Sequence, residues 1–185
     1  MTEGFAKEFL KPYYPVLQAS IQHGWSQYHQ VYTHPDHEAR TRANLIHDHA
    51  VGYAKQNLAP MAGIRYLRVQ ERNLFQIRDT VILSFKKLDQ QLLGSNYPTS
   101  FALEFAKQEH LPGIPDSLPR LNVGYVPDVT FTQLYGIFVT YPKSTGELNW
   151  SFQITDSEAI EAAQFTFEEQ LTSAKKRVKV RRYGT

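Results

Sequence analysis

The spacing of apolar residues changes once along this chain, near residue 63, and this change constrains the fold more than any other feature. Before it, apolar side chains recur every three to four positions, which is typical of amphipathic helices. The spacing predicts one helix over residues 16–32 and a second over 37–58, separated by Thr33-His34-Pro35-Asp36. Pro12 and Pro15 are expected to break the segment that precedes them.

After residue 63 the apolar positions alternate with polar ones, so the repeat is two, as in a half-buried strand. Short links rich in turn residues separate several of these stretches, which favours hairpins between neighbouring strands. The predicted strands are Ile64–Gln70, Leu74–Arg78, Thr80–Lys87, Leu121–Val126, Leu134–Tyr141 and Leu148–Ile154.

Two further helices are expected among and after these strands. Asn96-Tyr97-Pro98-Thr99 opens a short helix that continues to about His110. Residues 111–119 contain three prolines, which fix the backbone and remove amide donors, so an ordered loop is predicted there. Thr155 and Glu158 form a capping box, and the apolar spacing after it predicts a helix to about Ala174.

These elements together predict an α+β fold, with an antiparallel sheet of about six strands packed by about four helices on one face. With 185 residues, 42% of them hydrophobic, the chain is long enough for one domain with a substantial core. We therefore interpret residues 1–185 as a single domain. Its parts are N-terminal helices over 16–58, a mixed sheet and helix core over 64–174, and a basic tail over 175–185.

Several classes of protein are disfavoured by composition. The sequence has no cysteine, so it offers no disulfide and no thiolate nucleophile or metal ligand, and a cytoplasmic location is expected. It contains no apolar run long enough for a membrane span, and its first residues do not resemble a secretory signal. Common phosphate-loop, dinucleotide and zinc-protease motifs do not occur in the sequence, and no cofactor is expected.

Positive charge is concentrated near the C-terminus. Residues 175–182, called here the basic strip, hold six of the 20 basic residues and no acid, so the rest of the chain has 14 basic against 18 acidic residues. The strip can neutralise nucleic-acid phosphates or contact an acidic protein. Alternatively, it is a solvated helix end or a charge-protected edge strand. Its basic residues are Lys175, Lys176, Arg177, Lys179, Arg181 and Arg182.

Histidines are clustered as well, because six of the seven lie between His23 and His49. A metal-binding interpretation would use His34 and His37 with Asp36, since imidazole and carboxylate groups suit divalent ions. The sequence His47-Asp48-His49 is a poorer candidate, because residues two apart on a helix point in nearly opposite directions. We therefore expect no metal site, and surface or capping roles for most of these histidines.

One histidine is a candidate acid–base group. On the predicted helix His47 lies on the same side as Arg40, and the third predicted strand ends in Lys86 and Lys87. If these four residues converged, the imidazole could accept the proton of a ribose 2′-hydroxyl while the cations hold the phosphorane charge, without a metal. The alternative is that Arg40 and His47 only solvate their helix.

The stretch from Arg78 to Trp150 is similar to a pattern in uncharacterised bacterial proteins that are encoded in two-gene loci. The other member of such a locus resembles a helix-turn-helix regulator. The resemblance implies a regulator protein as partner and a toxin–antitoxin or phage-defence setting, and it assigns chemistry to no residue. It is carried by Ser84-Phe85-Lys86-Lys87-Leu88-Asp89, Asn96-Tyr97-Pro98-Thr99, Gln108, Leu111-Pro112-Gly113-Ile114-Pro115, Gly124-Tyr125 and Trp150.

Two functions of different classes stay open. The first is a toxin-like or defence-associated protein that acts on or binds nucleic acid, with His47, Arg40, Lys86 and Lys87 as its polar site; if it is an enzyme, metal-independent ribonuclease-like cleavage is expected. The second is a non-catalytic interaction module that uses the basic strip and exposed aromatic side chains. The sequence does not decide whether the protein is an enzyme.

Overall fold

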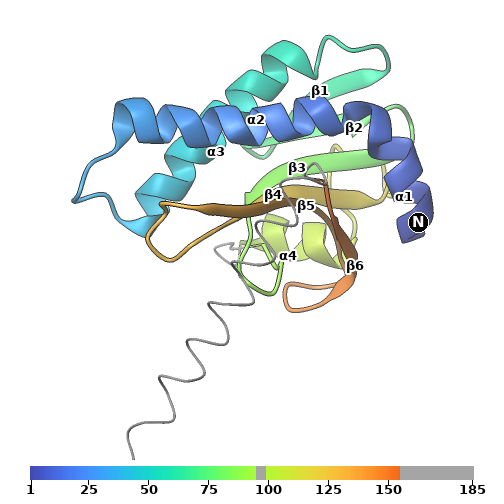
Figure 1. Ribbon diagram of the computed structural model, residues 1–185. Coiled ribbons are helices and arrows are strands. Elements are labelled where there is room, and N and C mark those ends of the chain that lie inside the picture. Colours follow the sequence, from blue (N-terminus) through green and yellow to red (C-terminus); the bar gives the residue numbers. More distant parts are fainter. Residues whose placement is uncertain (95–98, 155–185) are drawn as a thin grey trace, which may run out of the picture. The chain divides into compact units, whose positions relative to one another are not determined.

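A computed structural model describes residues 1–94 and 99–154, which contain four α-helices and six β-strands (Figure 1). The helices are α1 (Glu3–Leu10), α2 (Tyr14–Gln27), α3 (Ala39–Asn57) and α4 (Ser100–Lys107). The strands are β1 (Ile64–Val69), β2 (Arg72–Ile77), β3 (Val81–Lys87), β4 (Arg120–Pro127), β5 (Leu134–Pro142) and β6 (Leu148–Gln153).

The α+β class and the six strands are confirmed, but the sheet is mixed rather than wholly antiparallel. The strands lie in the order β1-β2-β3-β4-β5-β6, and every neighbouring pair is antiparallel except β3 and β4. In this parallel pair Ile82 lies opposite Arg120 and Lys86 lies opposite Gly124. Parallel neighbours need a long crossover, and here the connection contains α4, which fits this requirement.

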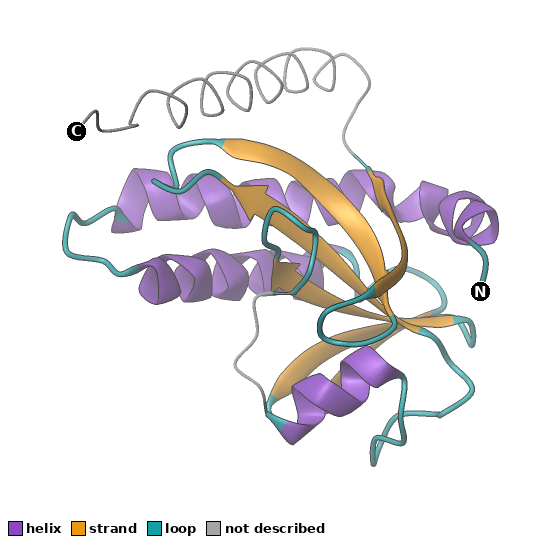
Figure 2. Cartoon of the chain, turned by 90° about the horizontal axis from the view of Figure 1, so that it is seen from below, coloured by secondary structure: helices purple, strands orange, loops and turns teal. Residues whose placement is uncertain are grey.

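Helices cover both faces of the sheet, so the expectation of helices on a single face was wrong. One core cluster joins α1, α2 and α3 to alternate residues of the strands, such as Leu83, Phe85 and Val123. A second cluster joins α4 and the loop after it to Leu74 and Ile82 on the opposite face. Figure 2 shows α4 across the sheet from α2 and α3. The parallel crossover explains this arrangement, because the connection passes over one face.

The N-terminal segment is helical, although its prolines were expected to break it. Thr2 caps α1, because its hydroxyl accepts a hydrogen bond from the amide of Phe5. Pro12 and Pro15 stand in the first turns of a short 3-10 helix and of α2, where a missing amide donor costs nothing. Ala6 and Leu10 are buried by this arrangement and extend the core beyond its predicted limit.

The two predicted N-terminal helices are confirmed as α2 and α3. Residues Tyr28–Tyr32 continue α2 as a wider helical turn, so the predicted end of the first helix falls close to the observed one. Gly24 lies where the two helices touch, because a β-carbon placed there would be 2.3 Å from the carbonyl oxygen of Ile46. This contact sets how closely α3, which carries His47, packs against α2.

Two predictions fall on residues that the structure does not describe. The helix expected after Thr155 and the basic tail both lie in 155–185, and part of the resemblance, Asn96–Pro98, lies in 95–98. Residues Met1–Ile154 form one compact unit. Ile154 ends this unit and continues the pairing beside β5, because its amide donates to the carbonyl of Ile137 over 2.9 Å.

Candidate functional site

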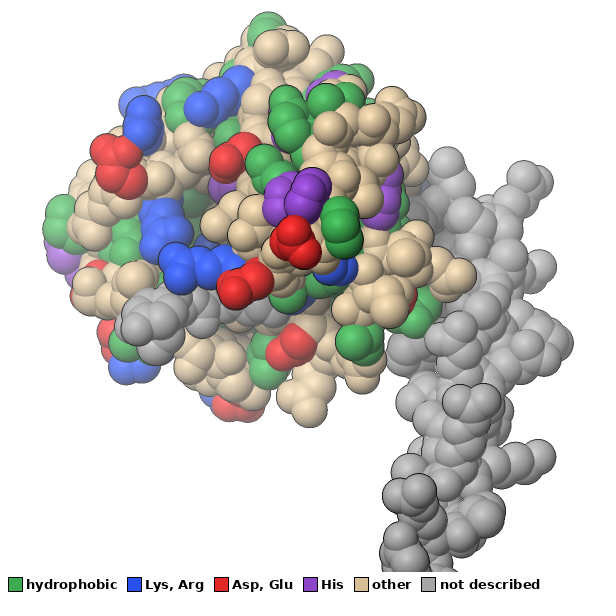
Figure 3. All heavy atoms as spheres, turned by 90° about the vertical axis from the view of Figure 1, so that its left-hand side faces the viewer, with side chains coloured by type: hydrophobic (Ala, Val, Ile, Leu, Met, Phe, Trp, Pro, Cys, Tyr) green, Lys and Arg blue, Asp and Glu red, His purple; other side chains and the backbone are tan. Residues whose placement is uncertain are grey.

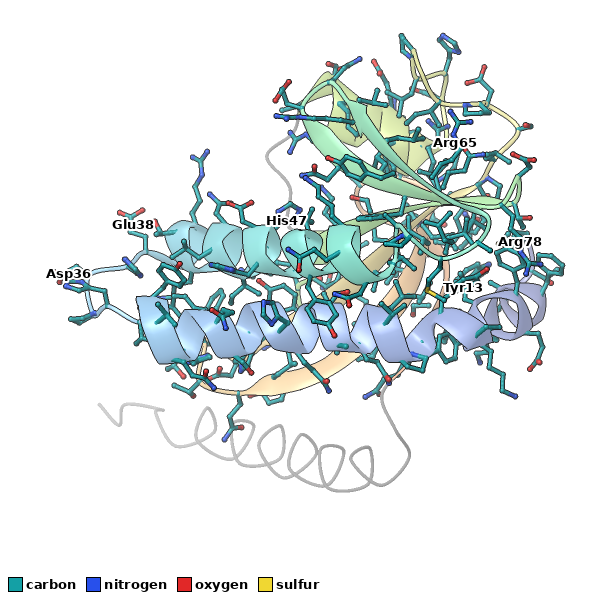
Figure 4. All side chains as sticks on the ribbon, turned by 90° about the horizontal axis from the view of Figure 1, so that it is seen from above. Tyr13, Asp36, Glu38, His47, Arg65 and Arg78 are labelled. Carbon is teal, nitrogen blue, oxygen red and sulfur yellow. The ribbon has the colours of Figure 1, made fainter. Side chains whose placement is uncertain are left out.

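His47 lies in the middle of α3, next to the buried residues Ile46 and Val51 that hold the helix against the core. Figure 4 shows His47 on the side of α3 that faces away from α2. Its side chain is 34% exposed, and its Nδ1 atom is 3.3 Å from the Oδ1 atom of Asp48. The Asp48 carboxylate therefore favours the tautomer with the proton on Nδ1, which leaves Nε2 as a proton acceptor.

The surroundings of His47 favour its neutral form. Burial is the largest influence and lowers the pKa of His47 below the usual 6.5, while the hydrogen bond with Asp48 acts in the opposite direction. The positive charges of Lys86 and Arg72 lower this pKa further, against the negative charge of Asp48. The net shift is downward, so the imidazole is mostly neutral at pH 7 and can accept a proton.

Lys86 and Arg72 come from two strands that separate beside α3. The β2–β3 pairing ends with Leu74 opposite Ser84, although β2 begins at Arg72 and β3 continues to Lys87. Lys86 is partly buried, and this burial, together with the positive charge of Arg72, lowers the pKa of Lys86 to about 8. Arg72 is exposed. We call His47, Lys86 and Arg72 the His47 group.

Of the four residues predicted to form the site, only His47 and Lys86 are linked, because the positive charge of Lys86 lowers the pKa of His47. Lys87 follows Lys86 on the strand and so faces the opposite way, towards the core beneath α1–α3, where its Nζ atom is 5.1 Å from the centre of the Phe131 ring. Arg40 is exposed on the first turn of α3, seven residues before His47, which corresponds to about 10 Å along the helix.

Two members of this region were missed by sequence reasoning. Arg72 stands in a stretch interpreted as a hairpin link, Glu71-Arg72-Asn73, so it was not placed on a strand beside Lys86. Asp48 was expected to point outward from the helix, and it does lie mostly exposed, yet its carboxylate reaches the neighbouring imidazole. The sequence did offer one signal for Arg72. It is a basic residue at the end of a hairpin, facing the strand that carries Lys86.

Most of the other histidines pack against aromatic rings. His23 lies 4.9 Å from Tyr53 and His29 lies 4.7 Å from Trp25, measured between ring centres. Figure 3, which views the end where α2 leads into α3, shows several histidines close together, with an acidic side chain beside them. Within residues 1–94 and 99–154, no three His, Asp or Glu side chains are arranged to hold a metal ion.

The remaining predicted binding residues are only partly placed. All six cations of the basic strip lie outside the described residues. Two aromatic side chains are not available to an interaction module, because Tyr13 and Tyr125 are buried in the core, with 4% and 1% of their surfaces exposed. Both stabilise the packing of the helices on the sheet.

Comparison with known proteins adds no family to these observations. No protein-family model, curated protein or solved structure matches the chain. Among the helices in the described part of the chain, none is both long enough and apolar enough to cross a membrane.

Proposed function

We propose that this protein binds RNA through its phosphodiester backbone and cleaves it without a metal ion, as a toxin-like or defence-associated enzyme. One observation carries the proposal: a neutral imidazole and two cationic side chains, from three different elements, lie close enough for their charges to interact. These are the groups that metal-independent cleavage of RNA needs, namely a base and cations that stabilise negative charge.

In the proposed reaction His47 acts as the general base. Its Nε2 atom takes the proton of the ribose 2′-hydroxyl, and the 2′-oxygen attacks the neighbouring phosphorus. Asp48 holds the imidazole through Nδ1, which keeps Nε2 available. The attack forms the bond from the 2′-oxygen to phosphorus and breaks the bond from phosphorus to the 5′-oxygen, so the products are a 2′,3′-cyclic phosphate and a 5′-hydroxyl end.

Lys86 and Arg72 act on the phosphate. The guanidinium of Arg72 stabilises the negative charge that develops on the phosphoryl oxygens. Lys86, with a pKa of about 8, is mostly protonated at pH 7 and can donate its proton to the departing 5′-oxygen. The low pKa makes this proton easier to release than that of an ordinary lysine.

Cleavage of a labelled RNA in excess EDTA tests this function. His47→Gln is expected to slow cleavage by about 100- to 10,000-fold, since a positioned base contributes about that much. Lys86→Met and Arg72→Met are expected to slow it by about 100- to 1,000-fold. Arg40→Met is the matched control, because Arg40 is an exposed cation on the same helix and lies away from the His47 group.

The outcomes separate the two functional classes. Cleavage that survives His47→Gln at full rate, or that requires a divalent metal, contradicts the proposal. If the wild-type protein binds RNA and does not cleave it, the non-catalytic alternative replaces the enzyme, with the basic strip as the next region to mutate. Growth arrest on expression of the wild-type protein, relieved by His47→Gln, would support the toxin-like role.

A further inference from the structure

Three adjacent side chains on β4 and β5 are buried without a hydrogen-bond partner for their polar atoms. Arg120 is 1% exposed, Asn122 is 5% exposed and Thr140 is fully buried. All three guanidinium nitrogens of Arg120, the Oδ1 atom of Asn122 and the Oγ1 atom of Thr140 lack a partner within the described residues. Buried polar groups in proteins nearly always have partners, so this concentration in one place calls for an explanation.

The three side chains point to the same side of the sheet. Leu121 and Val123 of β4 belong to the core beneath α1–α3, so the alternate residues Arg120 and Asn122 face the side covered by α4. Asn122 pairs directly with Thr140 across the β4–β5 ladder. From strand geometry, Arg120 and Asn122 are about 7 Å apart along β4, and Asn122 and Thr140 are about 5 Å apart across the ladder.

A buried arginine cannot lose its charge, so it needs an anion. Acidic residues lie near Arg120, and their charges partly offset the effect of burial, which lowers the pKa of Arg120. None of the described carboxylates hydrogen-bonds to the guanidinium. The carboxylate of Asp116, the strongest of these acidic influences, is instead bonded to His110 over 2.8 Å. The N–H donors of the Arg120 guanidinium therefore remain available on the side of the sheet that α4 covers.

We propose that Arg120, Asn122 and Thr140 form a binding site for a hydrogen phosphate group, either the free ion or the end of a phosphomonoester. The planar guanidinium donates two parallel hydrogen bonds to phosphate oxygens, and the Thr140 hydroxyl donates a third. The P–O–H of the ligand donates to Oδ1 of Asn122, which otherwise has no donor. An ionised carboxylate ligand lacks such a donor and would leave Asn122 unpaired.

The enclosure of the site limits the size of its ligand. Gln108, at the end of α4, donates from Nε2 to the carbonyl of Arg120 and accepts through Oε1 from the amide of Arg120, over 3.0 and 2.9 Å. These bonds hold α4 against the strand that carries the site. Because each of the three side chains is at most 5% exposed, the site suits a single phosphate group rather than a polynucleotide chain. The site is therefore separate from the His47 group and does not depend on its function.

Titration calorimetry of the full chain with inorganic phosphate tests the proposal. The wild-type protein is expected to bind phosphate, and Arg120→Met to weaken binding by at least about tenfold, since each hydrogen bond to a charged group is worth about 10- to 100-fold. Thr140→Val is expected to weaken it by about two- to tenfold. Arg65→Met, which removes an exposed arginine from β1, is the control and should bind phosphate as the wild type does.

Further measurements identify which type of phosphate ligand the site prefers and exclude non-specific effects. A nucleoside 5′-monophosphate that binds more tightly than inorganic phosphate indicates a phosphomonoester ligand, and weaker binding indicates the free ion. Sulfate at equal ionic strength should bind more weakly, because it has no O–H donor at pH 7.

Arg120→Met should unfold at the same temperature or higher, because it removes a buried unpaired charge. Equal phosphate binding by wild type and Arg120→Met, or no binding of either phosphate by the wild type, overturns the proposal.

Discussion

At the level of single residues, the pKa of His47 reports directly on its neighbours. The positive charge of Lys86 lowers this pKa, so Lys86→Met is expected to raise it. It should stay below 6.5, because burial of the imidazole is the larger cause and is retained. Titration of the His47 ring by NMR measures the change. Lys87→Met is the matched control, because Lys87 lies over Phe131, and it should leave the pKa of His47 unaltered.

Asp128 gives a second prediction at this scale. Burial raises the pKa of Asp128, but hydrogen bonds from Gln133, Thr130 and Thr132 outweigh it and lower the pKa to about 2. Since the ordinary value is 3.8, the folded state gains stability above pH 3.8 and loses it as the pH falls towards 2. Asp128→Ala should cost about 1 to 2 kcal/mol at pH 7, after allowance for solvent screening. Urea unfolding should show this gap closing near pH 2; a constant gap contradicts the assignment.

The residues of the site were only partly predictable. His47 and Lys86 could be selected because their residue types suit proton transfer and phosphate binding. Their proximity depends on where β2 separates from β3, which alternation alone does not reveal. Lys87 was grouped with Lys86 because they are adjacent in sequence, yet adjacent strand residues face opposite sides. Arg120 was not considered at all, because burial of a charged residue leaves no mark in the sequence.

At the level of elements, the close contact between α2 and α3 depends on Gly24. A β-carbon at Gly24 would lie 2.3 Å from the Ile46 carbonyl oxygen and 2.9 Å from the Ala50 amide. Gly24→Ala is therefore expected to push the helices apart and to lower the free energy of unfolding by about 1 to 3 kcal/mol. Gly52→Ala on α3 is the control, because a β-carbon there has nothing within 4 Å. It should stabilise the helix by up to about 1 kcal/mol.

Thermal unfolding of the two alanine variants checks this contact. A Gly24→Ala protein as stable as the wild type would mean that α2 and α3 do not approach as closely as described. The same substitution is also expected to reduce RNA cleavage, because α3 carries His47. Gly52→Ala should leave cleavage unchanged, which separates a shift of the helix from a general effect of alanine.

Elements whose patterns are local were predicted well, and those set by long-range contacts were not. The strands were recognised because alternation is visible within each strand. The parallel pairing of β3 and β4 and the placement of α4 on the second face depend on the path of the crossover, which no local pattern encodes. Helix α1 was missed because Pro12 and Pro15 were interpreted as breaks, although a first helical turn accepts proline.

At the level of the whole molecule, Met1–Ile154 forms one compact unit, so a chain ending at Ile154 is expected to fold and to unfold cooperatively. The truncation removes the six cations of the basic strip. If the strip contacts RNA, its removal should make the slope of log affinity against log salt concentration shallower, by up to about 4 for single strands. Binding isotherms at several salt concentrations measure this slope. An unchanged slope would exclude the strip from RNA binding.

The pH dependence of RNA cleavage in EDTA tests the central claim most directly. With His47 as base, the rate should fall at low pH as the imidazole becomes protonated, at a pH below 6.5 because its pKa is lowered. With Lys86 as acid, the rate should fall again above pH 8, where Lys86 loses its proton. The predicted result is a bell-shaped profile whose upper limb disappears in Lys86→Met. A rate that is independent of pH between 5 and 9, or cleavage that is absent without a metal, would contradict the proposed function.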